Sequence, residues 1–337
     1  MTATPDGLPK LGITLFSLTL EMRKPDYSLE SMIRRVAELD LGPGLEMVGF
    51  QSIRDWPRVS DQFVSEFRTL VDECELVPTA MSMNLDLALR RDRRMTEDEG
   101  LAYLEAQMEA AKTLGFPIGK SAILSTRTFV EGLARIAERL DMTFGVEVHS
   151  PESVDSPHVM ELRELFDAVG SPTLGFVPDF SSSMHDVPPT LVQAHRESGM
   201  PEELIELVSD VWHSDTSMPE KFARFAQEAD ALGATPADKG KLNMVLTMHG
   251  RMDPRRWEEL MPRVVHVHGK FYGIDDEGNE PSIDHETIMD VLVRAGYTGY
   301  ISSEWEGHAY TDAVSGWDMC RAHHDLCRRL LLQAAPV

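Results

Sequence analysis

Four short stretches that have the composition of β-strands each end on a side chain that can bind a metal ion. They are residues 143–147, 174–179, 264–268 and 299–304, which end at Glu147, Asp179, His268 and Glu304. One acid or histidine at the end of one strand indicates little, because it is more often a helix cap or a hydrogen-bonded core residue. In a barrel of parallel strands, however, the carboxyl ends of the strands converge on one point. The four residues together therefore predict one site with oxygen and nitrogen ligands.

Carboxylate oxygens combined with one imidazole suit a divalent ion. We expect Mn²⁺, and Mg²⁺, Co²⁺ or Zn²⁺ would fit the same ligands. Four ligands on an ion that prefers six leave two positions for a sugar carbonyl and its neighbouring hydroxyl. Such an ion would acidify the proton on the carbon between them and stabilise the enediolate oxygen that forms. A nearby carboxylate or histidine would take the proton.

Strand periodicity adds candidate catalytic groups beside these ligands. His149 follows Glu147 by two residues, so both side chains point to the same side of a strand. We expect Glu147 and Glu304 to take part in proton transfer and His149 to act as a general base or acid. Lys270 would stabilise an oxyanion if its strand continues that far. Either His266 or His268 could be the metal ligand, and we favour His268 because it lies nearer the end of its strand.

An aromatic and polar segment follows the last of these strands, where it could line a substrate pocket. The residues that we expect to contact substrate are Trp305, Glu306, His308 and His266. Trp305 could equally belong to the core. Glu46 shares the strand-end pattern, and we interpret it as mainly structural.

Strand and helix patterns alternate along the chain. The other predicted strands are residues 11–19, 45–50, 77–83 and 118–124, and the helices are 28–39, 63–74, 96–114, 128–140, 158–169, 285–295 and 315–332. Thr96 with Glu99 three residues later is the signature of a capping box. Eight strands that alternate with helices predict a (β/α)₈ TIM barrel, formed by residues 1–337 as a single domain.

One connection is far longer than an ordinary loop of such a barrel. We expect residues 181–262 to form a helical insertion after strand six, with helices near 201–211, 219–232 and 239–248. The insertion would be a lid or partner surface, or else an extra helical layer that only packs. His249 could reach the site only if the insertion folds over the barrel.

The composition limits the class of function. The chain of 337 residues has a formal net charge of −24, which argues against binding to nucleic acid. No apolar run is long enough to cross a membrane. The three cysteines, Cys74, Cys320 and Cys327, form no paired motif, and together with the polar N-terminus they predict a cytoplasmic protein.

The four strand ends resemble the sugar phosphate isomerase/epimerase family of xylose-isomerase-like TIM barrels. The similar segments are Gly145-Val-Glu-Val-His149, Phe176-Val-Pro-Asp179, His266-Val-His-Gly-Lys270 and Tyr300-Ile-Ser-Ser-Glu304. This resemblance covers almost the whole chain and implies a divalent metal held by Glu147, Asp179, His268 and Glu304. Many members have a histidine three residues after the aspartate, whereas this chain has Ser182 there.

Two further segments resemble the α subunits of bacterial C-glycoside deglycosidases. They are Leu41-Gly-Pro-Gly-Leu-Glu-Met-Val-Gly-Phe-Gln-Ser52 and Ala194-His-Arg-Glu-Ser-Gly-Met-Pro-Glu-Glu-Leu204. This narrower resemblance implies a 3-oxo-glycoside substrate and a smaller β subunit, and therefore a hetero-oligomer. A ketone at sugar C3 would acidify the C2 proton, and elimination would then expel the aromatic substituent at C1.

Three alternative functions use the same barrel. A sugar isomerase or epimerase would need the same metal and the same proton abstraction. A metal-dependent endonuclease is disfavoured by the acidic charge. A binding protein without activity would have no need of the intact Glu147 and Glu304.

Overall fold

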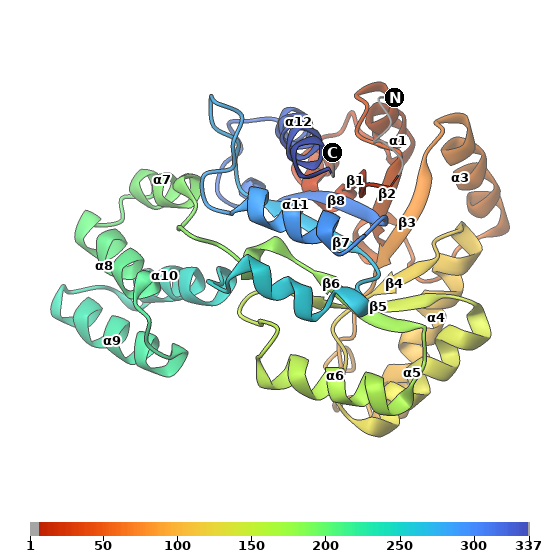
Figure 1. Cartoon of the computed structure of the whole chain (residues 1–337), viewed down its shortest axis with the longest axis horizontal. Coiled ribbons are helices and arrows are strands. Elements are labelled where there is room, and N and C mark those ends of the chain that lie inside the picture. Colours follow the sequence, from red (N-terminus) through yellow and green to blue (C-terminus); the bar gives the residue numbers. More distant parts are fainter. Residues whose placement is uncertain (1–6, 336–337) are drawn as a thin grey trace.

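Eight parallel strands form the centre of the fold, and helices surround them (Figure 1). The computed structural model describes residues 7–335. The strands are β1 Lys10–Thr14, β2 Gly44–Val48, β3 Val77–Ser82, β4 Ile118–Lys120, β5 Thr143–Val148, β6 Leu174–Pro178, β7 Val267–Phe271 and β8 Tyr300–Trp305. Each strand from β1 to β5 pairs with the next in the chain, and β8 pairs with both β1 and β7. The predicted TIM barrel is confirmed.

The barrel closes between β6 and β7 with less hydrogen bonding than elsewhere. Two parallel bridges join the strands there, Phe176 with Val264 and Asp179 with His268. The second bridge brings an acid and a histidine from opposite edges of the sheet side by side. Closure of the barrel therefore assembles part of the candidate site.

Most of the helices outside the insertion cover the outside of the barrel. The helices outside the insertion are α1 Leu29–Glu38, α2 Gly49–Ser52, α3 Asp61–Glu73, α4 Glu97–Leu114, α5 Arg127–Leu140, α6 Pro157–Val169, α11 His285–Arg294 and α12 Gly316–Ala334. Their buried apolar faces and the strands form one continuous core. The expected capping box of α4 is present, because the Thr96 side chain accepts from the Glu99 amide and the Glu99 carboxylate accepts from the Thr96 amide.

Three strands differ clearly from their expected bounds. β1 ends at Thr14 rather than at residue 19, because the chain turns there into the 3-10 helix Leu15–Leu18. β4 ends at Lys120 rather than near residue 124, since its pairing with β3 and β5 stops there. β7 begins at Val267 rather than Val264, because its hydrogen-bonded partner β8 begins only at Tyr300 and pairs from Ile301. β7 also continues to Phe271, so Lys270 lies within the strand, whereas Lys120 is the last residue of β4.

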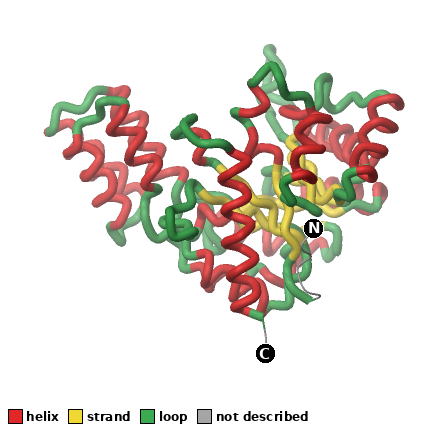
Figure 2. Tube along the Cα trace, turned by 90° about the horizontal axis from the view of Figure 1, so that it is seen from above, coloured by secondary structure: helices red, strands yellow, loops and turns green. Residues whose placement is uncertain are grey.

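The insertion projects to one side of the barrel as a group of helices (Figures 1 and 2). They are α7 Pro189–Glu197, α8 Glu202–His213, α9 Met218–Ala231 and α10 Pro236–Met248, with short 3-10 turns at Phe180–Ser182, Pro254–Glu259 and Met261–Arg263 where the chain leaves and rejoins the barrel. Three of these helices match the expected ones. The expected helices do not include α7, which begins at Pro189, a residue type that suits the first turn of a helix.

The last helix packs across the first and last strands. On α12, Cys320 and Cys327 are both buried, and His324 bonds to the backbone oxygen of Gly12 at 3.0 Å. Cys74, Cys320 and Cys327 are all free thiols. Among residues 7–335, no helix has the length and apolar character required to traverse a bilayer.

Candidate metal centre

The four predicted ligands meet at the carboxyl ends of β5 to β8. One potential ligand atom from each of Glu147, Asp179, His268 and Glu304 lies within 4.8 Å of the others. The Nδ1 atom of His268 is 2.7 Å from a Glu147 oxygen and 2.6 Å from a Glu304 oxygen. An Asp179 oxygen lies 3.7 Å from the same nitrogen. Residues separated by more than 150 positions in the chain thus share one point in space.

The free polar atoms at this point fit a bound cation. Asp179 Oδ2, His268 Nδ1 and Glu304 Oε2 are buried and form no hydrogen bond, although the Lys270 ammonium lies 3.3 Å from both carboxylate oxygens. Such atoms are costly to bury unless something pairs with them. Three carboxylate oxygens and one imidazole nitrogen match the donors that Mn²⁺, Mg²⁺ or Zn²⁺ accept. The residues present therefore fit a divalent ion.

A buried carboxylate on β2 fixes the orientation of the histidine ligand. Glu46 Oε1 accepts from His268 Nε2 at 2.8 Å and from the Ser82 hydroxyl at 3.0 Å. When Nε2 carries the proton, the lone pair of Nδ1 faces the other ligands, as in the carboxylate–histidine pairs of many metal sites. The second Glu46 oxygen lies 2.9 Å from His266 Nε2, which also bonds to Ser302. The Nε2 atom of His266 is thus occupied by Glu46 and Ser302, whereas Nδ1 of His268 forms no hydrogen bond. His268 rather than His266 is therefore the candidate ligand.

Two buried lysines balance the acids. Lys120, at the end of β4, places its ammonium 2.9 Å from Glu147. Lys270, on β7, lies 3.3 Å from both Asp179 and Glu304, and 2.7 Å from Glu306. Burial alone would raise the pKa of the Glu147 carboxyl, but the charges of Lys120 and His268 hold that pKa well below its usual range.

Burial and neighbouring charges also have opposite effects on the pKa values of Glu306 and His268. Burial raises the pKa of the Glu306 carboxyl, but Lys270, with a smaller contribution from His149, leaves that pKa below its usual value. For His268, burial lowers the pKa of the imidazole, whereas the surrounding glutamates, Glu304 first, raise it well above the usual value. Ligation requires the neutral imidazole, so a bound ion would displace that proton.

His149 directly follows β5, two residues after Glu147. Its side chain is partly exposed, and its Nδ1 atom is 2.5 Å from the backbone oxygen of Ser150. If Nδ1 donates to that oxygen, Nε2 is left as a proton acceptor. Burial raises the pKa of the Asp179 carboxyl, but Lys270 and then His149 lower it below its usual range.

The residues expected to contact substrate fall into two groups. Glu306 and His308 keep some exposed surface. His266 and Trp305, in contrast, are at most 1% exposed. His266 lies beneath the ligands, and the Trp305 indole donates to the backbone oxygen of Tyr272 at 3.2 Å. These two side chains support the site from below and do not face an open space.

Three residues near the site are not among the ligands and catalytic groups expected from the sequence. Glu46 was interpreted as structural, although it stands near the end of β2, as the ligands do on their strands. Lys120 was hidden because strand four was expected to run past it. His249, at the end of α10, does fold over the barrel, where its Nε2 atom lies 3.3 Å from the Tyr310 hydroxyl.

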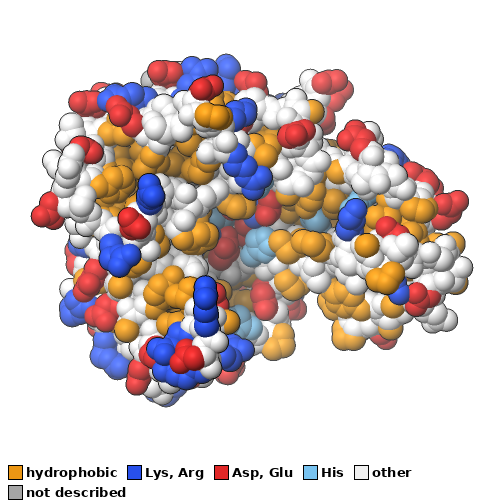
Figure 3. Space-filling view, turned by 180° about the vertical axis from the view of Figure 1, so that it is seen from behind, with side chains coloured by type: hydrophobic (Ala, Val, Ile, Leu, Met, Phe, Trp, Pro, Cys, Tyr) orange, Lys and Arg blue, Asp and Glu red, His pale blue; other side chains and the backbone are white. Residues whose placement is uncertain are grey.

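A hollow separates the barrel from the insertion, and acidic and histidine side chains are visible in it (Figure 3). A cavity of about 370 Å³ lies on the side of β5 and β6, and another of about 360 Å³ lies between α7 and the loops after β7 and β8.

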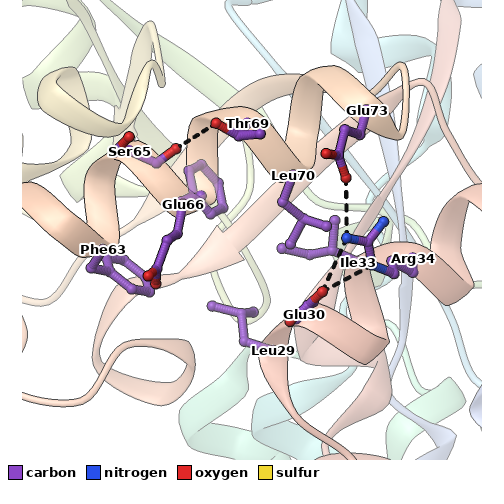
Figure 4. Close-up of a pocket in the computed structure, with 11 residues that line it drawn as sticks. Leu29, Glu30, Ile33, Arg34, Phe63, Ser65, Glu66, Thr69, Leu70 and Glu73 are labelled. Atoms are coloured by element: carbon purple, nitrogen blue, oxygen red, sulfur yellow. Dashed lines mark hydrogen bonds and ion pairs between the residues drawn. The ribbon is translucent and has the colours of Figure 1, made fainter.

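A third hollow of about 350 Å³ lies between α1 and α3 on the outside of the barrel (Figure 4). Its apolar side chains flank Arg34, which pairs with Glu30 and Glu73, and none of the candidate ligands lines it. The four ligands line none of these three hollows, but the first contains Ser150 and Ser182, which follow the ligand-bearing ends of β5 and β6.

Curated relatives share this chain's sequence over almost its full length. The 3'-dehydrocarminate deglycosidase alpha subunit of Microbacterium sp is 41% identical over 333 residues, which cover 96% of each chain. The C-glycoside deglycosidase alpha subunit of Arthrobacter globiformis is 39% identical over 329 residues, which cover 96% of this chain and 93% of the relative. Both span the barrel and the insertion.

Solved structures share the fold at low identity. A sugar phosphate isomerase/epimerase from Parabacteroides distasonis superposes with a TM-score of 0.54 at 15% identity, covering 100% of this chain and 96% of that one. A crystal structure of the IOLI protein with a bound zinc atom gives a TM-score of 0.55 at 14% identity, covering 97% and 99%. The profile of the xylose isomerase-like TIM barrels matches residues 40–323. This chain belongs to the xylose isomerase-like TIM barrel family.

Proposed function

We propose that this chain is the catalytic α subunit of a metal-dependent C-glycoside deglycosidase that acts on 3-oxo-C-glycosides. The observation that carries the proposal is the convergence of Glu147, Asp179, His268 and Glu304 on buried atoms without hydrogen bonds. The names of the relatives select C-glycoside cleavage among the reactions that such a centre supports. The relatives are alpha subunits, so we also propose a β subunit as partner.

The ligands would hold a divalent ion, for which we favour Mn²⁺. Bound there, the ion would supply positive charge beside the carbonyl and hydroxyl oxygens of the sugar. The Lys270 ammonium, which already faces the ligand oxygens at 3.3 Å, would add a second positive charge for a developing oxyanion. The site therefore favours a negatively charged enediolate over the neutral ketone.

Proton transfer is assigned to His149, Glu147 and Glu304. His149, through Nε2, would remove the proton from C2, and that electron pair would form a C2–C3 double bond with the charge on the C3 oxygen. When the C3 carbonyl re-forms, a C1–C2 double bond forms and the bond from C1 to the aglycone carbon breaks. The protonated His149 would return its proton to the aglycone carbon. Glu147 and Glu304 would orient the sugar hydroxyls and could accept protons in turn.

The direct test is aglycone release from a 3-oxo-C-glucoside with added Mn²⁺, with and without the copurified partner. We expect release by the wild-type complex and a loss of about 10²–10⁴-fold in kcat for His149→Asn. His158→Asn, a matched change on the outer helix α6, should leave the rate unchanged. Solvent proton exchange into a ketose without aglycone release would instead make the chain an isomerase or epimerase.

The metal ligands are tested separately by elemental analysis. Asp179→Asn and Glu304→Gln should each lower the content of bound divalent metal, because each removes one of the charged donors. Wild-type metal content in both variants would contradict the ligand assignment.

A further inference from the structure

We propose that the cavity between the insertion and the loops after β5 and β6 is a binding subsite for an aromatic carboxylate, built around Lys221. Assignment of this subsite to an acidic aglycone rests on the proposed function, whereas the binding itself does not. The subsite would select glycosides whose aglycone carries an acidic group.

The cavity borders the metal centre. Its volume is about 370 Å³, and its walls include Ser150, directly after His149, and Ser182, three residues after Asp179. The opposite wall comes from the insertion, at the end of α8, on α9, and from α10 to the segment that returns to the barrel. In Figure 3 the hollow between barrel and insertion is visible from behind. A ligand held at the metal could therefore extend into this cavity.

Lys221 is a buried cation without a buried counter-charge. Its side chain lines the cavity, and the residue is 8% exposed. Its ammonium donates to the backbone oxygen of Trp212 at 2.7 Å, and within the described part of the chain it has no carboxylate partner. An ammonium has three N–H donors, so two are left without a protein acceptor among the described residues. Burial of an unpaired charge is costly, and an anion in the cavity would offset that cost.

A second cation reinforces the positive charge. Arg251 donates to the backbone oxygen of His213 at 2.6 Å and to the side chain of Asp215 at 3.2 Å. Lys221 and Arg251 thus both bond near the C-terminus of α8, which carries only about half a negative charge. Asp215 is 96% exposed, so solvent screens it. Burial, together with the charge of Arg251, lowers the pKa of Lys221, which is the expected effect of two cations that share one anionic partner.

The acids on the cavity wall already have partners. Asp155 pairs with Arg256 at 2.7 Å. Glu152 accepts from the Ser156 hydroxyl, and Asp253 caps the following 3-10 turn through the Arg255 amide at 2.9 Å. None of these three acids forms an ion pair with Lys221.

The apolar part of the lining selects the rest of the ligand. Trp212, Leu246 and Met252 are buried and line the same cavity, and the Arg251 guanidinium lies 5.4 Å from the centre of the Trp212 ring. Apolar surface beside a cation favours a ring that bears a carboxylate over a free inorganic anion. A volume of about 370 Å³ has room for such a ring with substituents.

The test titrates benzoate and its neutral isostere benzamide into the full-length protein by calorimetry. We expect benzoate to bind at least tenfold more tightly than benzamide. Lys221→Gln should weaken benzoate at least tenfold and leave benzamide unchanged. Lys241→Gln, which removes an exposed lysine of α10, should alter neither. Equal affinities for the two probes, or unchanged benzoate affinity in Lys221→Gln, would overturn the proposal.

Two more variants test the subsite in case Lys221→Gln does not fold. Lys221→Arg keeps the charge and should retain benzoate, whereas Arg251→Gln should weaken it severalfold. If Lys221→Gln unfolds and Arg251→Gln binds benzoate like the wild type, the subsite is rejected. Aglycone release measured on the same samples separates the two proposals. Benzoate binding without release rejects the deglycosidase assignment alone, and release without benzoate binding rejects the subsite alone.

Discussion

At the scale of single residues, the chemistry depends on which atom of each side chain is left free. His268 has two ring nitrogens, and Glu46 occupies one of them at 2.8 Å. The other nitrogen is thereby aimed at Glu147 and Glu304. A carboxylate that touches no substrate thus determines whether the histidine can serve as a ligand.

Replacement of Glu46 by Gln should weaken metal binding. The amide keeps one acceptor oxygen for His268 and Ser82, but it loses the negative charge and places an NH₂ donor where the second Glu46 oxygen lies 2.9 Å from His266 Nε2, so the imidazole of His268 is held less firmly. We expect the Kd for Mn²⁺, measured by competition with a chelator, to rise about 10- to 100-fold. Glu38→Gln, an exposed change on α1, should leave the Kd unchanged. A wild-type Kd in a folded Glu46→Gln protein would show that Glu46 does not orient the ligand.

At the scale of elements, the junction of β6 and β7 is the critical one. A Cβ added at Gly175 would lie 2.4 Å from the backbone oxygen of Arg263 and 2.4 Å from the Val265 side chain. The strand therefore needs glycine at this position so that the segment before β7 can approach. That approach sets the bridge between Asp179 and His268.

We expect Gly175→Ala to destabilise the fold by about 1–3 kcal/mol, because the added methyl group meets backbone that cannot move without opening the barrel. Urea unfolding measures this change in the free energy of unfolding. Gly240→Ala is the matched control, since its Cβ would meet open space on the exposed side of α10. That variant should be neutral or more stable by up to about 1 kcal/mol. A Gly175→Ala protein as stable as the wild type would mean that the junction can widen freely.

At the scale of the whole molecule, several histidines are buried without charge. Burial lowers the pKa values of His249, His285 and His324 to about 4. An unfolded histidine titrates near 6.5. Between these pH values the unfolded chain binds more protons than the folded chain, so acidification favours unfolding. The stabilisation is complete above about pH 6.5 and is lost as the pH falls toward 4.

His324 allows this to be measured far from the metal ligands. Its loss of stabilisation between pH 7.5 and pH 5.0 should be about 2 kcal/mol. We expect His324→Gln to show a correspondingly smaller drop in unfolding free energy over that interval, measured in EDTA so that metal release does not contribute. His158→Gln, on the outer helix α6, should retain the full drop. An unchanged drop in His324→Gln would exclude a titrating His324.

The sequence alone predicted the barrel and most of its elements, and it named four candidate ligands that the structure brings together. These strand ends carry a local signal, because short strand-like runs end at or beside Glu147, Asp179 and Glu304, and the barrel prediction needed only the alternation of strands with helices. The capping box at Thr96 and three helices of the insertion were predicted for the same reason, since each depends on contacts within a few residues.

Only the tertiary structure decided which nitrogen of which histidine faces the ligands, and it added Glu46, Lys120 and His249 to the site. Their distances to the ligands depend on how eight strands tilt and close, which no local pattern records. The cavity around Lys221 arises in the same way, because α9 and the end of α8 meet loops from β5 and β6. Local sequence patterns indicate which residues stand at the ends of strands. Long-range packing determines which atoms of those residues meet.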